Sequence, residues 1–343
     1  MPKLTSLPFR WGSPDGDKGK EPVCGRRILA SVVACILAIA SAAAAYPDKP
    51  LRLIMPYPAG GSIDTAGRAV AQKLAEKFRQ QVVVDNRTGS GGTIGTEPGA
   101  RAAPDGYTLV MGGTGTLALS PHLQRNLPYD PVRDFAPATM LIASPYVLVV
   151  HPSVPVTSVK ELIALAKSRP GQINYASGGN GSAPHFASEM FNTAAGVKLT
   201  HIPYKGSTPA VIDLIGGQVQ VMFTGIPSVL ANIKNNRLRA IAVTGKTRTA
   251  ALPDVPTVIE SGVPSYEVSP WFGVLVPART PPAIVTILNH EIVAVLRAPA
   301  LRERFAVEGI DPVGDTPDHF AAYIKEEIVK WGNVVKAIGM RAE

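Results

Sequence analysis

Short apolar runs alternate with stretches of helical periodicity along most of the chain, and this alternation constrains its fold more than any other feature. The first runs, bounded by Gly, Pro or Asn, are Leu51–Met55, Val82–Val84, Tyr107–Met111 and Tyr146–Val150. Continuous apolar strands of this kind are expected in parallel sheets that helices cover on both faces. After Gly61, apolar residues recur at helical spacing on one face: Ile63, Ala66, Val70, Leu74 and Phe78. The pattern predicts an α/β fold.

A second set of strand–helix units follows His151. Its expected strands are Ile173–Ala176, Leu199–Ile202, Val219–Phe223 and Leu238–Val243, with a later one at Phe272–Val276. Ser158 and Glu161 form a capping-box pattern that opens a helix. Further helices are expected near Pro184–Ala194, Pro209–Ile215 and Pro227–Asn235, and from about Pro281, Ala300 and Pro317. Because 343 residues are more than a single hydrophobic core usually organises, the chain is expected to form two domains, each with its own sheet.

The N-terminal segment has the order of a secretory signal peptide. Arg26 and Arg27 precede an apolar run from Ile28 to Ala40, and small residues then lead to Tyr46. A membrane-spanning helix is the alternative, but the run is shorter than the ~20 residues that a bilayer requires. Residues 1–45 are therefore expected to be a signal peptide, cleaved near Ala45/Tyr46, and the protein is expected in the periplasm.

Both cysteines, Cys24 and Cys35, fall in the segment expected to be removed. Lipidation of Cys35 remains an alternative, although the apolar run continues past it. The mature chain is then expected to have no disulfide, thiol nucleophile or cysteine metal site. Residues 1–45 carry six Lys/Arg and three Asp/Glu, so their removal lowers the net charge from +8 to +5. The basic residues form no run or stripe, which disfavours nucleic-acid binding.

The chain shows no motif of a common enzyme class. It has no G-x-S-x-G elbow, P-loop or HExxH sequence, and its six histidines are dispersed. Gly113 to Ala118 match a G-x-G-x-x-A dinucleotide pattern, but Pro121 leaves little room for the helix that would hold a pyrophosphate. A hydrolase or lyase is the rival reading, and it would rely on Ser182 with His185. No nearby carboxylate orients that pair, so no enzyme activity, cofactor or metal site is expected.

Two similar loops are the best candidates for a binding site. Pro56–Ser62 joins a strand to the helix that carries Asp64, and Ser177–Ser182 joins a strand to the helix that carries His185. Glycines at a helix N-terminus expose backbone N–H groups, and the helix dipole there favours an anion. Glycine also permits close approach and positive φ. The alternative is that these glycines only permit tight turns and do not contact a ligand.

At these residues the chain resembles the Bug family, the extracytoplasmic receptors of tripartite tricarboxylate transporters. The resemblance rests on motifs spread in order along the chain from residue 56 to residue 257. They are Pro56–Gly61 with Asp64, Asn86-Arg87 with Gly89, Gly91-Gly92 and Ile94-Gly95, Ala103–Tyr107, Leu127–Pro131, Tyr204–Gly206, Ala242–Thr244 and Leu252–Thr257.

The resemblance implies a periplasmic-binding-protein-like, type II-like "Venus flytrap" with two domains, each a mostly parallel sheet flanked by helices. Domain 1 is expected to comprise residues 46–147 plus 268–343, and domain 2 residues 148–267. The implied function is capture of a small organic carboxylate for the membrane permease subunits of a tripartite tricarboxylate transporter. A sensory module that signals carboxylate availability is an alternative. A monomer is expected.

The two loops and neighbouring strand ends supply the expected ligand-binding residues. They are Tyr57, Ala59, Gly60, Gly61, Ser62, Asp64, Thr114, Gly115, Ser177, Gly178, Gly179, Asn180, Gly181, Ser182, His185, Tyr204 and Thr224. Asp64 is ambiguous, because it could stabilise its helix or orient a bound water. Many relatives are expected to have an acidic residue at the position of Thr224. A neutral side chain there would give no partner to the ammonium group of an amino acid, so a simple mono- or dicarboxylate is the expected ligand.

Overall fold

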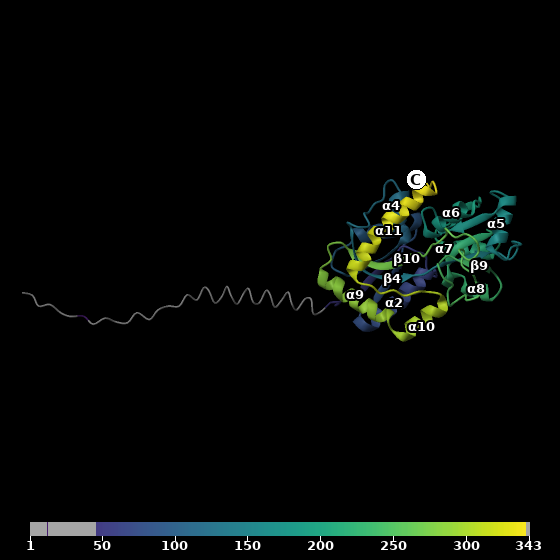
Figure 1. Ribbon diagram of the computed structural model, residues 1–343. Coiled ribbons are helices and arrows are strands. Elements are labelled where there is room, and N and C mark those ends of the chain that lie inside the picture. Colours follow the sequence, from purple (N-terminus) through teal and green to yellow (C-terminus); the bar gives the residue numbers. More distant parts are fainter. Residues whose placement is uncertain (1–11, 13–45, 341–343) are drawn as a thin grey trace, which may run out of the picture. The chain divides into compact units, whose positions relative to one another are not determined.

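The computed structural model describes residues 12 and 46–340 (Figure 1). The expected signal peptide and its cleavage site therefore lie outside the described residues. From Pro47 onward the chain belongs to one compact unit. Among the described residues no single helix is long and apolar enough to cross a membrane, and only a pair bent by 68°, Pro282–Leu296 with Pro299–Glu308, passes by length and composition together.

In the described part of the chain, ten strands form two five-stranded sheets with the same internal order. The first sheet has the order β2-β1-β3-β10-β4, with β1 (Leu51–Met55), β2 (Val82–Asn86), β3 (Thr108–Gly113), β4 (Phe135–Ala143) and β10 (Trp271–Pro277). The second has the order β7-β6-β8-β5-β9, with β5 (Tyr146–Val150), β6 (Asn174–Ser177), β7 (Thr200–Pro203), β8 (Val221–Gly225) and β9 (Arg239–Val243).

One strand in each sheet runs against the other four. β10 is antiparallel to both of its neighbours in the first sheet, and β5 is antiparallel to both of its neighbours in the second. Each of these strands directly follows a passage from one sheet to the other. The chain leaves the first sheet between Ala143 and Tyr146 and returns between Val243 and Trp271. The expected domain boundaries at 147/148 and 267/268 remain a prediction.

We call the first sheet with its helices lobe 1 and the second sheet with its helices lobe 2. Lobe 1 contains α2 (Ser62–Phe78), α3 (Thr93–Ala100), η2 (Thr114–Leu119), α4 (Ser120–Leu123), α9 (Pro282–Leu296), α10 (Pro299–Glu308) and α11 (Pro317–Ala337). Lobe 2 contains α5 (Val159–Ser168), α6 (Ala183–Ala195), α7 (Ser207–Ile215), η3 (Ile226–Ser228) and α8 (Leu230–Lys234). Because helices cover the sheets, β5 and β10 are buried along their whole length.

A buried carboxylate ties the start of β10 to α11. Glu327 accepts hydrogen bonds from the indole N–H groups of Trp271 and Trp331 and from Lys330. The Trp331 ring then packs edge-on against Phe186 of α6, with 4.9 Å between ring centroids. Helix α11 therefore belongs to lobe 1 but also contacts the helix that begins at the second glycine loop. One continuous hydrophobic core includes residues of both lobes.

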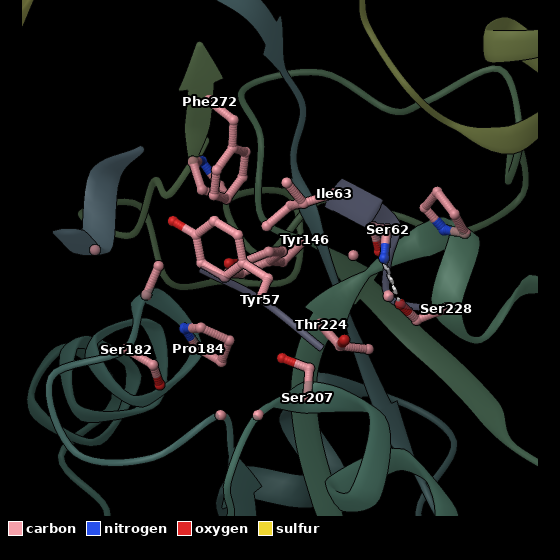
Figure 2. Close-up of a pocket in the computed structure, with 18 of the residues that line it drawn as sticks. Tyr57, Ser62, Ile63, Tyr146, Ser182, Pro184, Ser207, Thr224, Ser228 and Phe272 are labelled. Atoms are coloured by element: carbon pink, nitrogen blue, oxygen red, sulfur yellow. Dashed lines mark hydrogen bonds between the residues drawn. The ribbon is translucent and has the colours of Figure 1, made fainter. Parts of the chain in front are cut away.

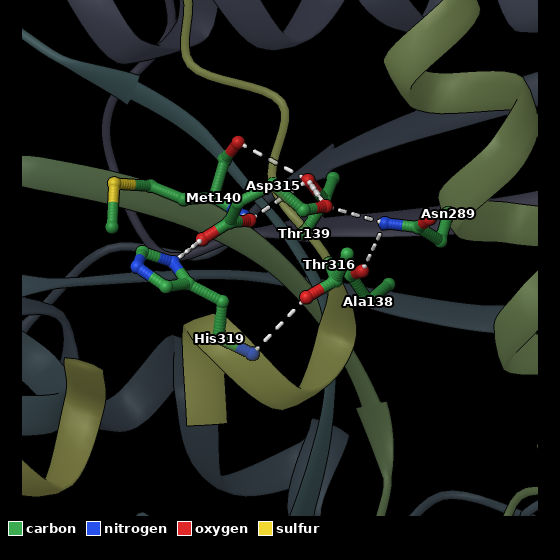
Figure 3. Close-up of polar contacts among 7 residues, drawn as sticks. All are labelled: Ala138, Thr139, Met140, Asn289, Asp315, Thr316 and His319. Atoms are coloured by element: carbon green, nitrogen blue, oxygen red, sulfur yellow. Dashed lines mark hydrogen bonds and ion pairs between the residues drawn. The ribbon is translucent and has the colours of Figure 1, made fainter. Parts of the chain in front are cut away.

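A polar network fixes the N-terminus of α11 on β4 (Figure 3). The Asp315 carboxylate accepts hydrogen bonds from the Met140 amide at 2.7 Å and the Thr139 hydroxyl at 3.1 Å. It also pairs with His319, at 3.0 Å. Asn289 of α9 donates to the Ala138 and Asp315 carbonyls. These bonds satisfy backbone groups at the edge of the sheet, so they hold α9, α11 and β4 in one arrangement.

Candidate functional site

A cleft lies between the two sheets, and most of its wall is apolar (Figure 2). Its volume is about 80 Å³. The apolar lining is Pro56, Tyr57, Pro58, Ile63, Ile142, Pro145, Tyr146, Ala183, Pro184, Ile226, Pro227, Pro270, Phe272 and Ile310. The polar lining is Ser62, Thr88, Ser144, Ser182, Ser207, Thr224 and Ser228, and the rest is glycine. None of the described residues that line the cleft is an Asp, Glu, Lys, Arg or His.

The first loop, between β1 and α2, is held in shape by Asp64. Its carboxylate accepts from the Gly60 amide at 2.9 Å, from Arg68 at 2.8 Å and from Asn86 at 2.8 Å. Burial raises the pKa of Asp64, but these hydrogen bonds outweigh that effect and hold the pKa below its usual value. Asn86 also donates to the Tyr57 carbonyl. Asp64 does not line the cleft, so its observed contacts fix the loop.

Helix α2 begins at this loop with its N-terminus at the cleft. Gly61 precedes the helix in an extended conformation and, as a glycine, has no side chain to cap it. The Ser62 amide donates to the Ser228 hydroxyl at 3.1 Å, and the two hydroxyls lie 2.8 Å apart (Figure 2). Ser228 belongs to η3 in lobe 2, so this pair links the two lobes beside the cleft. The start of α2 retains the positive end of the helix dipole.

The second loop, between β6 and α6, is fixed mainly by its own hydroxyls. Ser177 accepts from the Gly179 amide at 3.0 Å, and Ser182 donates to the Gly179 carbonyl at 2.6 Å. The imidazole of His185 accepts from the Gly181 amide at 3.2 Å. Gly178 and Ser182 line the cleft, whereas the rest of the loop turns away from it. The loop therefore contacts the cleft only near its start and at its end.

His185 is a neutral structural residue at ordinary pH. Its ring stacks on His201 with 4.0 Å between centroids, and His201 stacks in turn on Tyr175. Burial, together with the neighbouring His201, lowers the pKa of His185 to about 3. The Ser182 hydroxyl donates to a carbonyl and accepts from the His185 amide, so it makes no nucleophile–imidazole hydrogen bond. This arrangement lacks the geometry that an activated serine requires.

The structure divides the expected site residues into three groups. Those that line the cleft are Tyr57, Gly61, Ser62, Gly115, Gly178, Ser182 and Thr224. A second hollow on the other side of the Gly178–Gly181 loop is lined by Gly178, Gly179, Asn180, Gly181, His185 and Tyr204. Ala59, Gly60, Asp64, Thr114 and Ser177 line neither. The Thr114 hydroxyl instead accepts from the Trp271 amide and so fixes the start of β10.

Three of the five glycines in the two loops adopt positive φ. Gly60, Gly179 and Gly181 have φ of +78°, +111° and +72°, a region that favours glycine. Gly61 has φ of −78° and Gly178 does not have a positive φ, so backbone strain does not explain glycine at these two positions. A β-carbon at Gly178 would lie 3.3 Å from the Ser207 hydroxyl. Close approach, rather than backbone strain, therefore explains glycine at this position.

Sequence reasoning missed most of the apolar wall and four hydroxyl-bearing residues of the lining, Thr88, Ser144, Ser207 and Ser228. Tyr146 and Phe272 belong to β5 and β10, and Ile142 and Ile310 come from distant parts of lobe 1. No sequence signal indicates that strands so far apart present side chains to one cleft. Ser207 is different, because Gly206-Ser207 is a third strand-to-helix junction, between β7 and α7. The glycine-at-a-junction pattern that identified the other loops could have identified it as well.

Burial raises the pKa of two tyrosines in the cleft wall, Tyr57 and Tyr146, well above the usual value. Both phenols are therefore neutral. The Tyr57 hydroxyl is buried and has no hydrogen-bond partner among the described residues. The described residues of the cleft wall thus present no fixed charge at ordinary pH, and an ionised ligand would depend on amides, hydroxyls and helix dipoles.

Comparisons with known proteins identify close relatives. A model of the tripartite tricarboxylate transporter family receptor matches residues 66–340. Protein BugT of Bordetella pertussis is 40% identical over 319 residues, which cover 91% of this chain and 98% of that protein.

Two solved structures extend the similarity to three dimensions. A Rhodopseudomonas palustris protein solved with adipate is 35% identical with a TM-score of 0.85, over 87% of this chain and 100% of that one. MatC of the same species, solved with bound malate, is 30% identical with a TM-score of 0.81, over 84% and 100%. The expected α/β fold of two-domain periplasmic binding proteins is confirmed.

Proposed function

We propose, from the premise that this chain belongs to the receptor family of tripartite tricarboxylate transporters, that its cleft binds a small organic carboxylate. The chain is a solute-binding receptor by family. Its relatives solved with adipate and with malate support a carboxylate as the ligand class here. In this proposal the protein holds the acid between its lobes and delivers it to membrane permease subunits, without changing it chemically.

The convergence of two helix N-termini on one uncharged cleft carries this proposal. Gly61 and Ser62 start α2 from lobe 1, and Gly178 and Ser182 precede α6 from lobe 2. Amides at a helix N-terminus together with the helix dipole stabilise an anion without a cationic side chain. Because no acidic side chain lines the cleft in the part of the chain that the structure describes, the cleft offers no ionised partner to an ammonium group. A carboxylate suits such a site better than an amine does.

Export, oligomeric state and domain movement are proposed from the resemblance to the receptor family. Residues 1–45 direct the chain to the periplasm and are cleaved near Ala45/Tyr46. The receptor acts as a monomer, and residues 46–147 plus 268–343 move as one domain against residues 148–267. Ligand contact involves the expected residues that line the cleft. The second hollow, with Asn180, His185 and Tyr204, supports the loop from behind.

A thermal-shift screen of the mature protein against small carboxylates tests the proposal. A ligand at 100 times its Kd stabilises the folded state by about 2.7 kcal/mol, so a true ligand raises the unfolding temperature by several degrees. Recovery of the acid unchanged after incubation is expected. Amines of the same size should give no shift. A library in which no acid stabilises the protein, or in which an acid is consumed, would contradict the proposed function.

A further inference from the structure

We infer that the ligand is a monocarboxylate with an apolar body, bound with its carboxylate toward lobe 2 and its body against the aromatic rings between β1, β5 and β10. This inference rests on the proposed function, because it narrows the class of carboxylate that the same cleft accepts. It concerns the distal end of the ligand, which the two helix N-termini do not reach.

The cleft has a polar side and an apolar side (Figure 2). The hydroxyl-bearing side chains Ser182, Ser207 and Thr224 lie together on elements of lobe 2. Ser207 and Thr224 make no side-chain hydrogen bond with any described residue, so their hydroxyls are available to a ligand. The Ser62 and Ser228 hydroxyls bond to each other instead. A carboxylate placed on this side would gain hydrogen bonds that the empty cleft leaves unmade.

The opposite side consists mainly of rings and branched chains, and its buried polar atom with no partner among the described residues is the neutral Tyr57 hydroxyl. Tyr57 packs edge-on against Phe272, with 5.5 Å between ring centroids, and Tyr146 and Ile63 adjoin them (Figure 2). Tyr146 and Phe272 are only 6% and 4% exposed, so a group that reaches this side leaves water almost completely. An apolar body gains from this transfer in proportion to the area that it buries.

A second ionised group would be unpaired on this apolar side. None of the described residues that line the cleft is a Lys or Arg, so a second carboxylate would be desolvated without a counter-charge. The charged residues nearest in sequence to this wall are acidic. Glu308 precedes the lining residues Gly309 and Ile310, and Asp311 follows them. Glu308 is already paired with Arg304, and neither acid lines the cleft. The described lining therefore offers no carboxylate to an ammonium group at the distal end of a ligand.

Matched acids that differ only at the distal end test this inference by calorimetry on the mature protein. One set is hexanoate, adipate and 6-aminohexanoate, and the shorter set is butyrate, succinate and 4-aminobutyrate. Within each set the monocarboxylate should bind at least tenfold more tightly than the other two. Adipate or 6-aminohexanoate binding as tightly as hexanoate would overturn the inference and leave the proposed function standing. Hexanamide binding as tightly as hexanoate would instead contradict the proposed function.

Two variants locate the two ends of the ligand. Thr224→Val removes a hydroxyl at constant shape, so it should weaken hexanoate and adipate by the same several-fold factor and leave their ratio unchanged. Phe272→Leu removes part of the apolar wall, so it should weaken the binding of hexanoate more than the binding of adipate. The ratio of the two affinities should therefore become smaller. The opposite pattern, with the ratio changed by Thr224→Val and unchanged by Phe272→Leu, would contradict the assigned orientation. The wild-type comparison decides the monocarboxylate claim without either variant.

Discussion

At the scale of single residues, the cleft depends on side chains that never touch it. Asp64 is the clearest example, since its carboxylate accepts from the Gly60 amide, Arg68 and Asn86 and so determines the path of the loop before α2. The sequence left its role open between helix stabilisation and water orientation. The hydrogen bonds to the loop show a third role, which spacing alone does not indicate, because Asn86 comes from the next strand.

Asp64→Asn should destabilise the protein by about 1–3 kcal/mol at pH 7, because buried hydrogen-bond donors lose an ionised acceptor. The pKa of Asp64 is lowered in the folded state, so its contribution is complete above the unfolded value of about 3.9. That contribution is lost as pH falls through the folded pKa. Urea unfolding should show a larger difference between wild type and variant at pH 7 than at pH 3. The exposed Asp318→Asn is the control, and an equal loss there would refute the assigned role.

At the scale of elements, most strands were predictable and their exceptions have physical reasons. β1 and β5 were predicted at their observed bounds, because continuous apolar runs mark strands buried on both faces. β4 was missed because it contains Pro137. The structure accommodates that proline at a sheet edge beside a register shift, where a lost amide costs little. α3 was missed because Gly95 and Pro98 are weak helix formers.

The candidate site was predictable only where chemistry and local structure coincide. Glycine at a strand-to-helix junction identified two loops, and both reach the cleft. The aromatic wall was not predictable, because a ring on a buried strand faces either a core or a cleft depending on how the lobes pack. For His185, the sequence pattern suggested a role that its observed contacts do not support. Its position after a glycine loop suggested ligand contact, but its ring stacks on His201 in the second hollow.

The stacked pair predicts a pH dependence of the second loop. The folded-state pKa of His185 is lowered to about 3, whereas the unfolded chain takes up this proton near pH 6.5. Stability from a neutral His185 is therefore complete above about pH 6.5 and falls as pH decreases toward 3. His185→Gln should flatten the change in unfolding free energy between pH 7 and pH 5, measured by urea titration. His290→Gln, at an exposed histidine, should leave the change intact. An unaltered slope in His185→Gln would refute the prediction.

At the scale of the whole molecule, the two lobes touch at glycines that surround the cleft. A β-carbon at Gly91 would lie 2.9 Å from the Asn180 carbonyl oxygen, and one at Gly206 would lie 2.6 Å from the Pro58 ring. At Gly225 it would lie 2.7 Å from the β-carbon of Ser62. The Thr208 hydroxyl also donates to the Ala59 carbonyl across the same boundary. This arrangement corresponds to lobes closed over the cleft, and the account's central claim is that both close on one ligand.

Gly225 offers a way to disturb the contact between the lobes at the cleft, where both Gly225 and Ser62 belong to the lining. Its φ of −64° and ψ of 138° are ordinary for any residue, so alanine there costs little backbone strain. The added β-carbon conflicts only with Ser62 of the other lobe, apart from an ordinary contact with Pro227. Gly225→Ala therefore serves as the matched variant for a test of closure, with unfolding free energy as its control.

Hydrogen–deuterium exchange of the mature protein, with and without the tightest-binding acid of the two matched sets, tests the central claim most directly. The acid should slow exchange of the amides at Gly61–Ile63 and at Gly178–Ala183 together, because one ligand contacts both lobes. In Gly225→Ala the same acid should protect both segments less, while stability without ligand is unchanged. Slower exchange in only one of the two segments of the wild-type protein would contradict the claim that both lobes close on one ligand.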